Sequence, residues 1–298
     1  MKRVLLFLLF TMTVSAQSKK PISGTAVRAL QRPAAVTVQE MKFQSAALGR
    51  EMPYRVILPA GYGDSAKRYP TLYLLHGLGG SYTNWETNTH LIDEAAKYDL
   101  LIVLVEGGNS WYVNSATVAE DKFEDYFLKD LIPEVDQKFR TLRTKFGRAV
   151  AGLSMGGFGA IRYALRAPQS FAFAGSLSGA LDITRNPDVQ KNYMKYGIDK
   201  IFAPLDKAGD SDFDIQVLAG KADAASLPYL YLACGTDDRF LQSNRELTKL
   251  LSDRKINYEY HEMRGAHDWS FWDSFMTEML NAMLRRKFMR VHLPPSAH

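Results

Sequence analysis

The sequence predicts an α/β fold in which helices flank a mostly parallel central sheet. Three observations support this prediction. Short apolar runs alternate with stretches of helical periodicity, an order typical of βαβ units around a parallel sheet. The 298 residues are 46% hydrophobic and 23% charged, which is ordinary for a globular protein with a sizeable core. One apolar run also leads directly into a glycine-rich turn that carries Ser154 and is followed by a helical pattern.

The first 35 residues divide into two segments on composition. Met1-Lys2-Arg3 is basic, Val4 to Phe10 is an unbroken apolar run, and Val14-Ser15-Ala16 offers a cleavage site of small residues. These features predict a signal peptide over residues 1–16, because the apolar run is shorter than the about 20 residues that cross a bilayer. Residues 17–35 are polar, basic and interrupted by proline, which predicts a flexible leader. We therefore expect a secreted or periplasmic protein with no membrane insertion after cleavage.

A predicted domain over residues 36–290 begins with a pair of strands and continues with the alternating pattern. Val36–Phe43 and Tyr54–Leu58 are strand-like runs joined by a turn at Leu48-Gly49-Arg50. Six further apolar runs predict the parallel part of the sheet. They are Thr71–Leu75, Leu101–Val105, Arg148–Ala151, Phe173–Leu177, Tyr229–Ala233 and Ile256–Tyr260.

Helical stripes fill the intervals between these runs. Leu91–Ala96 and Phe127–Ile132 each place their apolar residues on one face, and the longest stripe runs from Phe271 to Leu284. The spacing of that last stripe predicts packing against the core. The stretch 180–227 lies between two predicted strands and has no strand pattern of its own, so we expect a lid-like insertion that folds over the site.

Charge and cysteine content exclude several classes of protein. The formal net charge of +5 falls to +3 when Lys2 and Arg3 leave with the signal peptide, and the remaining basic residues are spread along the chain. No nucleic-acid motif accompanies them, so we expect no nucleic-acid partner. Cys234 is the only cysteine, which rules out an intrachain disulfide and a cysteine-rich zinc site. We expect no metal or organic cofactor, and the sequence does not indicate an oligomeric state.

The turn Gly152-Leu153-Ser154-Met155-Gly156 predicts a nucleophile elbow. A serine between a strand and a helix takes a strained backbone conformation that aims its hydroxyl outward, and side chains at Gly152 and Gly156 would collide with it. Met155 to Ala167 has a helical pattern that ends before Pro168. Ser154 therefore lies at a helix N-terminus, where free N–H groups favour a developing negative charge. The alternative is a glycine-rich turn with an ordinary surface serine.

A serine nucleophile needs a base to take its proton and an acid to orient that base. In a fold with a nucleophile elbow, the acid and then the histidine come after the serine in the sequence, on loops that follow later strands. Cys234–Leu241 and Arg264–Trp269 are such loops. His267 is the candidate base, because the other histidines fall in a helical stretch, at a strand end or in the tail. Asp237 and Asp238 are both candidates for the acid, since one of them can cap the helix that follows.

The oxyanion that forms during acyl transfer needs two preorganised N–H donors. One candidate is the backbone N–H of Met155, directly after the serine. The second should come from the turn after the strand Thr71–Leu75, where His76-Gly77-Leu78-Gly79-Gly80 stands, and we assign it to Leu78 N–H. We expect His76 to shape this turn and not to react.

Four segments together resemble the putative-esterase family of α/β-hydrolases, and the similarity runs from about Val36 to Arg286. They read Y-L-L-H-G-L-G-G, G-L-S-M-G-G-F-G-A, C-G-T-D-D-R-F-L and G-A-H-D-W. The family includes feruloyl and acetyl xylan esterases, S-formylglutathione hydrolase and bacterial mycolyltransferases. In its pattern the acid precedes x-F-L, which selects Asp238. The resemblance thus implies an α/β-hydrolase fold and a serine carboxylesterase with Ser154, Asp238 and His267 as the triad and Leu78 and Met155 as the oxyanion hole.

The match to the family is poorer where substrate would be chosen. Val105-Glu106-Gly107-Gly108 stands where many members read Pro-Asp-Gly, and residues 180–227 match no subgroup. Trp85, Trp111 and Tyr112 fall in loops at the expected carboxyl ends of strands. We predict that they line an acyl or sugar subsite, the alternative being that they only pack.

Export and aromatic surface together predict the substrate. We expect a short-chain or aromatic ester of the acetyl or feruloyl type, carried by a small molecule or a polysaccharide and hydrolysed through an acyl-enzyme. Three alternatives remain: acyl transfer to a sugar or lipid alcohol, a thioesterase like S-formylglutathione hydrolase, and a non-catalytic carbohydrate-binding relative. The complete triad argues against the last of these.

Overall fold

The computed structural model describes residues 35–288, which take in all but the last two residues of the predicted domain. The predicted signal peptide over residues 1–16 and nearly all of the predicted leader lie outside the described residues. Within residues 35–288 no helix is both long enough and apolar enough to cross a membrane.

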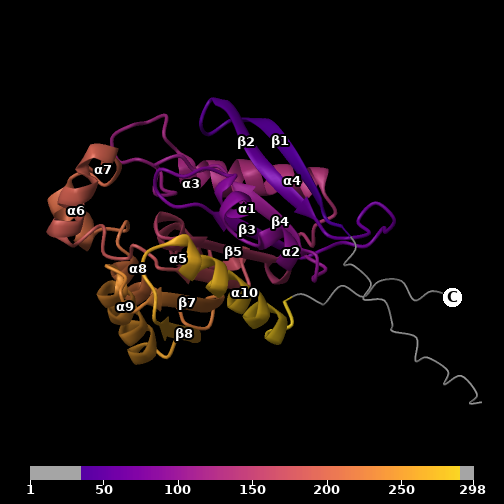
Figure 1. Ribbon diagram of the computed structural model, residues 1–298. Helices are drawn as coiled ribbons and strands as arrows, with labels where there is room; N and C mark the ends of the chain where they lie inside the picture. The colour runs from indigo at the N-terminus through magenta and orange to yellow at the C-terminus, as the bar shows by residue number, and fades with distance from the viewer. Residues whose placement is uncertain (1–34, 289–298) are drawn as a thin grey trace, which may run out of the picture. The chain divides into compact units, whose positions relative to one another are not determined.

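An eight-stranded sheet organises the described residues (Figure 1), with the strand order β1-β2-β4-β3-β5-β6-β7-β8. The hairpin of β1 and β2 is antiparallel, β2 joins β4 antiparallel, and every pairing from β4 to β8 is parallel. The predicted mostly parallel sheet is therefore confirmed. The strands are β1 (Thr37–Ser45), β2 (Arg50–Leu58), β3 (Thr71–Leu75), β4 (Leu101–Val105), β5 (Arg148–Leu153), β6 (Phe173–Leu177), β7 (Tyr229–Gly235) and β8 (Tyr258–Met263).

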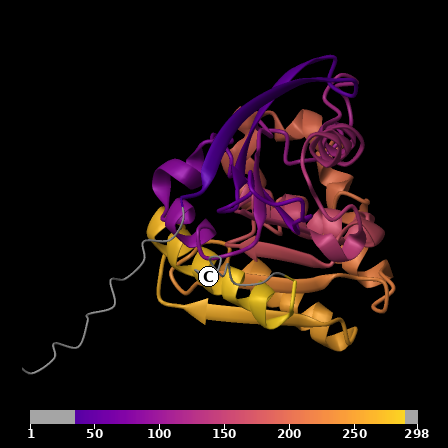
Figure 2. The same cartoon turned by 90° about the vertical axis from the view of Figure 1, so that its right-hand side faces the viewer.

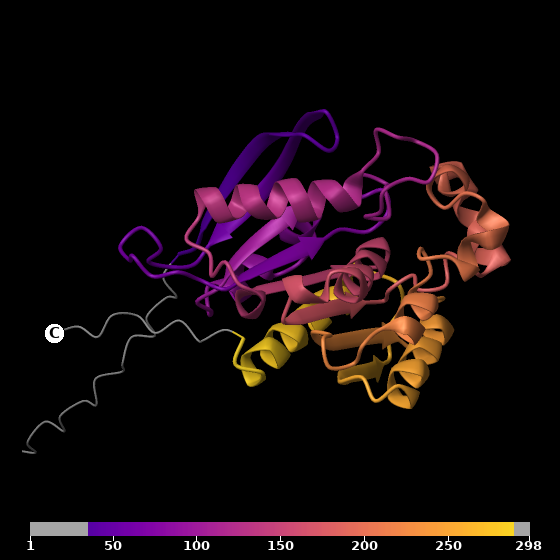
Figure 3. The ribbon, with the colours of Figure 1, turned by 180° about the vertical axis from the view of Figure 1, so that it is seen from behind.

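Helices pack on both faces of this sheet, so the core has two parts. Alternate residues of β3 separate between them: Tyr73 and Leu75 belong to one buried cluster, Leu72 and Leu74 to the other. α10 lies over the face of the sheet that is turned to the viewer in Figure 1. α4 lies over the opposite face, which is turned to the viewer in Figure 3. The helices are α1 (Asn84–Asn88), α2 (Leu91–Ala95), α3 (Phe123–Asp125), α4 (Ile132–Lys138), α5 (Met155–Arg166), α6 (Pro187–Tyr193), α7 (Ile198–Ile201), α8 (Ile215–Lys221), α9 (Leu241–Asp253) and α10 (Trp269–Arg285).

One strand boundary and one helix boundary differ from the predicted pattern for local reasons. β8 begins at Tyr258, two residues later than predicted, because Lys255 has φ 55° and Ile256 N–H bonds back to Leu251 O at the end of α9. α10 begins at Trp269, because the Asp268 side chain caps it by accepting the N–H of Phe271. This cap fixes the residue just before it, His267, at the sheet edge. Figure 2 shows α10 running alongside the strands.

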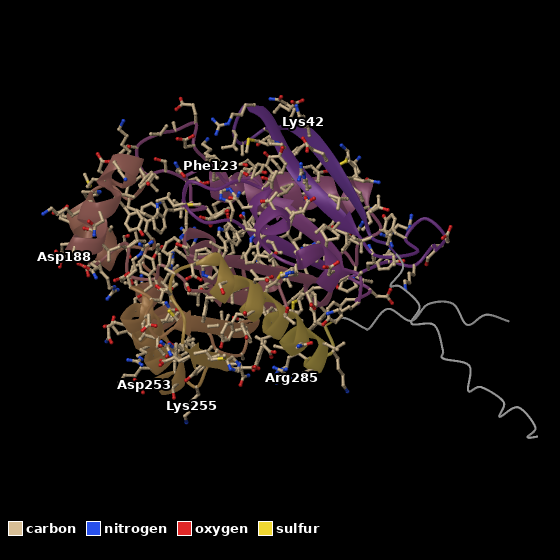
Figure 4. The ribbon with its side chains drawn as sticks, in the orientation of Figure 1. Lys42, Phe123, Asp188, Asp253, Lys255 and Arg285 are labelled. Carbon is tan, nitrogen blue, oxygen red and sulfur yellow. The ribbon has the colours of Figure 1, made fainter. Side chains whose placement is uncertain are left out.

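The stretch 180–227 is helical and lies between β6 and β7. It contains α6, α7 and α8, and the first two lie away from the strands in Figures 1 and 3. Figure 4 shows Asp188 of α6 on the outer side of this segment. On the inner side, Tyr193 and Tyr196 line the cavity at Ser154. The segment therefore contributes directly to the walls of the site.

Candidate active site

Ser154 occupies the turn between β5 and α5 with φ 53° and ψ −115°. This region is sparsely populated by residues with a side chain, and the turn keeps it only because its neighbours allow a very close approach. A Cβ on Gly152 would lie 2.5 Å from the carbonyl carbon of Gly156. A Cβ on Gly156 would lie 2.7 Å from His76 O and closer still to Leu75 O. The elbow therefore requires glycine on both sides of the serine, as its sequence indicates.

The structure brings Ser154, His267 and Asp238 together from the ends of three parallel strands. Ser154 Oγ lies 2.9 Å from His267 Nε2, and His267 Nδ1 lies 2.9 Å from Asp238 Oδ2. Asp237, the other candidate acid, is exposed and contributes only its N–H to Gly265 O. The geometry thus pairs Asp238, and not its neighbour, with the histidine.

The surroundings of Asp238 keep its carboxylate charged. Burial raises the pKa of Asp238, but hydrogen bonds from His267 and from Phe240 N–H outweigh burial, and the net pKa lies below its ordinary value. An ionised carboxylate can only accept hydrogen bonds, so His267 Nδ1 carries the proton. His267 Nε2 then presents its lone pair to the Ser154 hydroxyl. The rings of Phe240 and Trp272 hold the imidazole edge-on, with centroids at 5.1 and 5.0 Å.

Two backbone N–H groups are the candidates for holding the oxyanion. Met155 opens α5, so its N–H has no partner within the helix. Leu78 N–H belongs to the turn after β3, and no backbone or side-chain acceptor for it occurs among residues 35–288.

His76 fixes the orientation of that second donor. The ring is fully buried, and its Nδ1 lies 2.7 Å from Gly77 O. Because a carbonyl oxygen can only accept a hydrogen bond, Nδ1 is the donor. Its Nε2 accepts the N–H of Gly107 at 3.0 Å. Gly77 C=O and Leu78 N–H belong to one planar peptide unit, so holding the carbonyl also aims the N–H. His76 therefore shapes the turn and does not face the cavity.

A cavity of about 320 Å³ lies in front of Ser154. Two tyrosines of the 180–227 segment and two tryptophans of α10 supply its aromatic surface, and the exposed Arg239 stands at its edge. No sequence pattern marks these residues as part of a site. Trp269 belongs to the same short motif as His267, and Arg239 follows Asp238, so closeness to the triad was the available signal. The lining comprises Gly77, Leu78, Gly79, Gly80, Asn84, Leu153, Ser154, Tyr193, Tyr196, Arg239, His267, Trp269 and Trp272.

The predicted substrate-binding role of Trp85, Trp111 and Tyr112 is wrong, because all three side chains lie in the core. Each is only 1% exposed, and none lines the cavity at Ser154. Trp85 Nε1 donates to Leu75 O, and Tyr112 OH donates to His76 O, both at 3.0 Å. Trp111 packs edge-on against three rings: Phe158, Tyr193 and Phe202. These residues therefore belong to the packing around the site and not to its surface.

Within the described residues, no group of three or more His, Cys, Asp or Glu side chains is arranged to hold a metal ion. Cys234 is buried on β7 with a free thiol, and burial raises its pKa well above the ordinary value. It packs as a small apolar residue.

Comparison with known proteins places this fold and site in a family. The family model described as "Putative esterase" matches residues 45–283, so the chain belongs to that family. It has the α/β-hydrolase fold, and it is a serine hydrolase that acts on carboxylic esters. The family inferred from the four sequence segments is confirmed.

Proteins named as esterases or serine hydrolases are similar to this chain in sequence and in structure. An acetyl esterase of Caldicellulosiruptor saccharolyticus is 29% identical over 262 residues, which cover 83% of this chain and 98% of the relative. An endo-1,4-beta-xylanase/feruloyl esterase of Xylanibacter ruminicola is 35% identical over 155 residues, covering 48% of this chain and 21% of the relative. The solved structure of FphF, a fluorophosphonate-binding serine hydrolase of Staphylococcus aureus, superposes with a TM-score of 0.77 at 25% identity, covering 84% of this chain and 99% of FphF.

Proposed function

We propose that the protein is an exported carboxylesterase that removes short-chain or aromatic acyl groups, of the acetyl or feruloyl type, from carbohydrates. The observation that carries this proposal is the hydrogen-bonded row from Asp238 through His267 to Ser154, which ends at a cavity with aromatic walls. Serine esterases use such a row to activate the hydroxyl and to return its proton to the leaving group.

In the first half of the reaction Ser154 Oγ attacks the ester carbonyl carbon while His267 Nε2 takes the hydroxyl proton. The carbonyl oxygen becomes an oxyanion between the N–H groups of Leu78 and Met155. One such donor contributes a factor of about 10² to 10³ to turnover. His267 then gives its proton to the alkoxide oxygen, the alcohol leaves, and the acyl group stays on Ser154.

In the second half a water molecule occupies the position of the departed alcohol. His267 takes its proton, the hydroxide attacks the acyl carbon, and the proton returns to Ser154 as the acid leaves. We favour water over an alcohol as acceptor because the acetyl esterase relative matches over 98% of its own length. The partition of acyl groups between water and an added sugar alcohol measures this preference.

Three features support a carbohydrate ester as substrate. Tyr193, Tyr196, Trp269 and Trp272 present rings in the cavity, and both sugar faces and phenolic rings stack on aromatic side chains. The named relatives include acetyl and feruloyl esterases. The signal peptide predicted over residues 1–16 would deliver the enzyme outside the cytosol, where polysaccharide esters occur and glutathione thioesters are not made.

A panel of substrates tests the proposal. We expect kcat/KM for methyl ferulate or an acetylated xylo-oligosaccharide to exceed that for S-formylglutathione and for long-chain p-nitrophenyl esters by at least about tenfold. This ratio corresponds to about 1.4 kcal/mol of transition-state preference. An optimum on the thioester, or rates that rise with acyl length beyond about eight carbons, would contradict the proposed substrate.

A further inference from the structure

A second cavity, of about 300 Å³, lies beside the cavity at Ser154, and Tyr196 lines both of them. Its volume reaches the lower end of the range for small-molecule sites, about 300 to 1,000 Å³. Gly108, Asn109 and Ser110 contribute polar backbone and side-chain groups. Apolar side chains form much of the wall, and charged groups complete the lining. The apolar residues are Val113, Val118, Phe123 and Ile201, and the charged residues are Arg50, Asp121 and Lys200.

The loop after β4 connects this second cavity to the oxyanion turn. Asn109 lines the second cavity, and its Oδ1 accepts the N–H of Gly79 at 2.8 Å. Gly79 in turn lines the cavity at Ser154 and follows Leu78 directly. Ser110 steadies the same loop by donating its hydroxyl to Gly107 O at 2.6 Å. The second cavity therefore lies on the oxyanion side of the serine.

The position of His267 decides which half of an ester can reach that cavity. The leaving oxygen must receive a proton from His267 Nε2, so the alcohol half lies beside the histidine. His267 follows β8, at one end of the sheet order, whereas the loop with Asn109 follows β4 on the other side of β5 and Ser154. The acyl half extends away from the histidine, and this direction leads to the second cavity.

We propose that the second cavity is the acyl subsite and that it takes an aromatic ring with polar substituents, of the hydroxycinnamic acid type. The inference rests on the proposed function. The apolar walls suit the faces of a ring, and Phe123 is a buried aromatic surface with the guanidinium of Arg50 at 5.5 Å from its centroid. The side chains of Arg50 and Asp121 lie 4.0 Å apart. Arg50 can donate hydrogen bonds to phenolic and methoxy oxygens, and Asp121 can accept one from a phenolic hydroxyl. An acetyl group is too short to leave the cavity at Ser154.

Two substrates that carry an aromatic ring on opposite sides of the ester bond test this assignment. Methyl ferulate carries its ring on the acyl side, and p-nitrophenyl acetate carries its ring on the alcohol side. The substitution Val118→Trp places an indole in the second cavity from a half-buried loop position. We expect the ratio of kcat/KM for methyl ferulate to that for p-nitrophenyl acetate to fall at least about tenfold. Ile201→Phe, at another residue of the lining, should lower the ratio in the same direction.

The matched control is Val38→Trp, on the exposed strand β1 and outside both cavities, for which the ratio should stay within about twofold of the parent. An unchanged ratio in both cavity variants would overturn the assignment. A ratio that rises, because p-nitrophenyl acetate loses more, would assign the cavity to the alcohol half and also overturn it.

A binding experiment separates this inference from the proposed function. Ferulic acid is titrated calorimetrically into the Ser154→Ala protein with and without Val118→Trp, so no turnover is needed. We expect the Kd to rise at least about tenfold when the cavity is filled. Equal affinities, or no binding to Ser154→Ala, would contradict the acyl subsite even if every ester were hydrolysed. Binding that depends on Val118 in a wild-type protein without esterase activity would instead contradict the proposed function alone.

Discussion

Two turns at the same edge of the sheet contain residues with positive φ and lead to opposite results. Ser154, after β5, has φ 53°, and Trp111 and Tyr112, after β4, have φ 56° and 57°. The first turn presents its side chain to the cavity and to His267. The second turns both of its rings into the core, where each is 1% exposed. A positive φ at the edge of a parallel sheet is therefore not by itself a sign of a catalytic side chain.

The difference between the turns lies in where the glycines that they require stand in the sequence. The elbow depends on Gly152 and Gly156, two residues to either side of the serine. Tyr112 instead packs into space left by two glycines outside its own turn. A Cβ on Gly159 of α5 would lie 2.7 Å from its ring, and a Cβ on Gly107, five residues earlier in the loop, would lie 2.6 Å from its Cζ. Glycines two residues to either side of the serine leave a motif in the sequence, whereas glycines scattered over a loop and a separate helix do not.

The largest loss of activity should come from replacing the histidine that accepts the proton of Ser154. We expect His267→Ala to lower kcat/KM for p-nitrophenyl acetate by about 10⁴ to 10⁶, because the triad acts as a unit and the serine loses its base. Stopped-flow or steady-state kinetics on the folded variant, verified by circular dichroism, provide the measurement. A loss below about tenfold would mean that Ser154 has another base.

The next effect separates two adjacent carboxylates. Asp238→Asn should cost about 10⁴ in turnover, because an amide oxygen with a competing NH₂ no longer fixes the tautomer of His267. Asp237→Asn is the matched control and should stay within about threefold of the parent, since that side chain is exposed. If the two losses were exchanged, the acid would be Asp237 and the observed pairing would not be the functional one.

The sequence predicted the sheet well because each buried parallel strand is a short apolar run between helical stretches. β3, β4 and β6 have the predicted bounds. It also predicted the three residues that the structure joins at the elbow, because each lies in a compact motif after a strand. Tyr193 and Tyr196 were missed, because no pattern in residues 180–227 shows which side of that segment faces the cavity. The aromatic residues of the β4 loop were assigned wrongly for the same physical reason, since long-range packing directs them.

A measurement of stability tests the second turn, the one after β4. Trp111→Ala should lower the free energy of unfolding by about 3 to 5 kcal/mol, because it leaves a large cavity among buried rings. Urea denaturation measures this loss, and the milder Trp111→Phe keeps the protein folded for kinetics. A raised KM for aromatic esters in Trp111→Phe, with stability unchanged, would restore the substrate-binding role that the structure argues against.

A smaller effect should follow from one hydroxyl in the same turn. Tyr112→Phe removes the hydrogen bond to His76 O and leaves a buried carbonyl with one partner fewer, which costs about 1 to 2 kcal/mol. Tyr196→Phe is the control on a half-buried ring and should change the unfolding free energy by less than about 0.5 kcal/mol. Equal changes in the two variants would show that the buried hydroxyl does not hold the turn.

The most direct test of the account is the site at which an activated serine is labelled. Ser154 has a positive φ, a base at 2.9 Å and 8% exposure, whereas Ser178 also has a positive φ, 51°, but is fully buried. A fluorophosphonate probe followed by peptide mapping should modify Ser154 in the wild-type protein and no residue in Ser154→Ala. Labelling of Ser178, or equal labelling of the wild type and Ser154→Ala, would contradict the claim that Ser154 is the activated nucleophile.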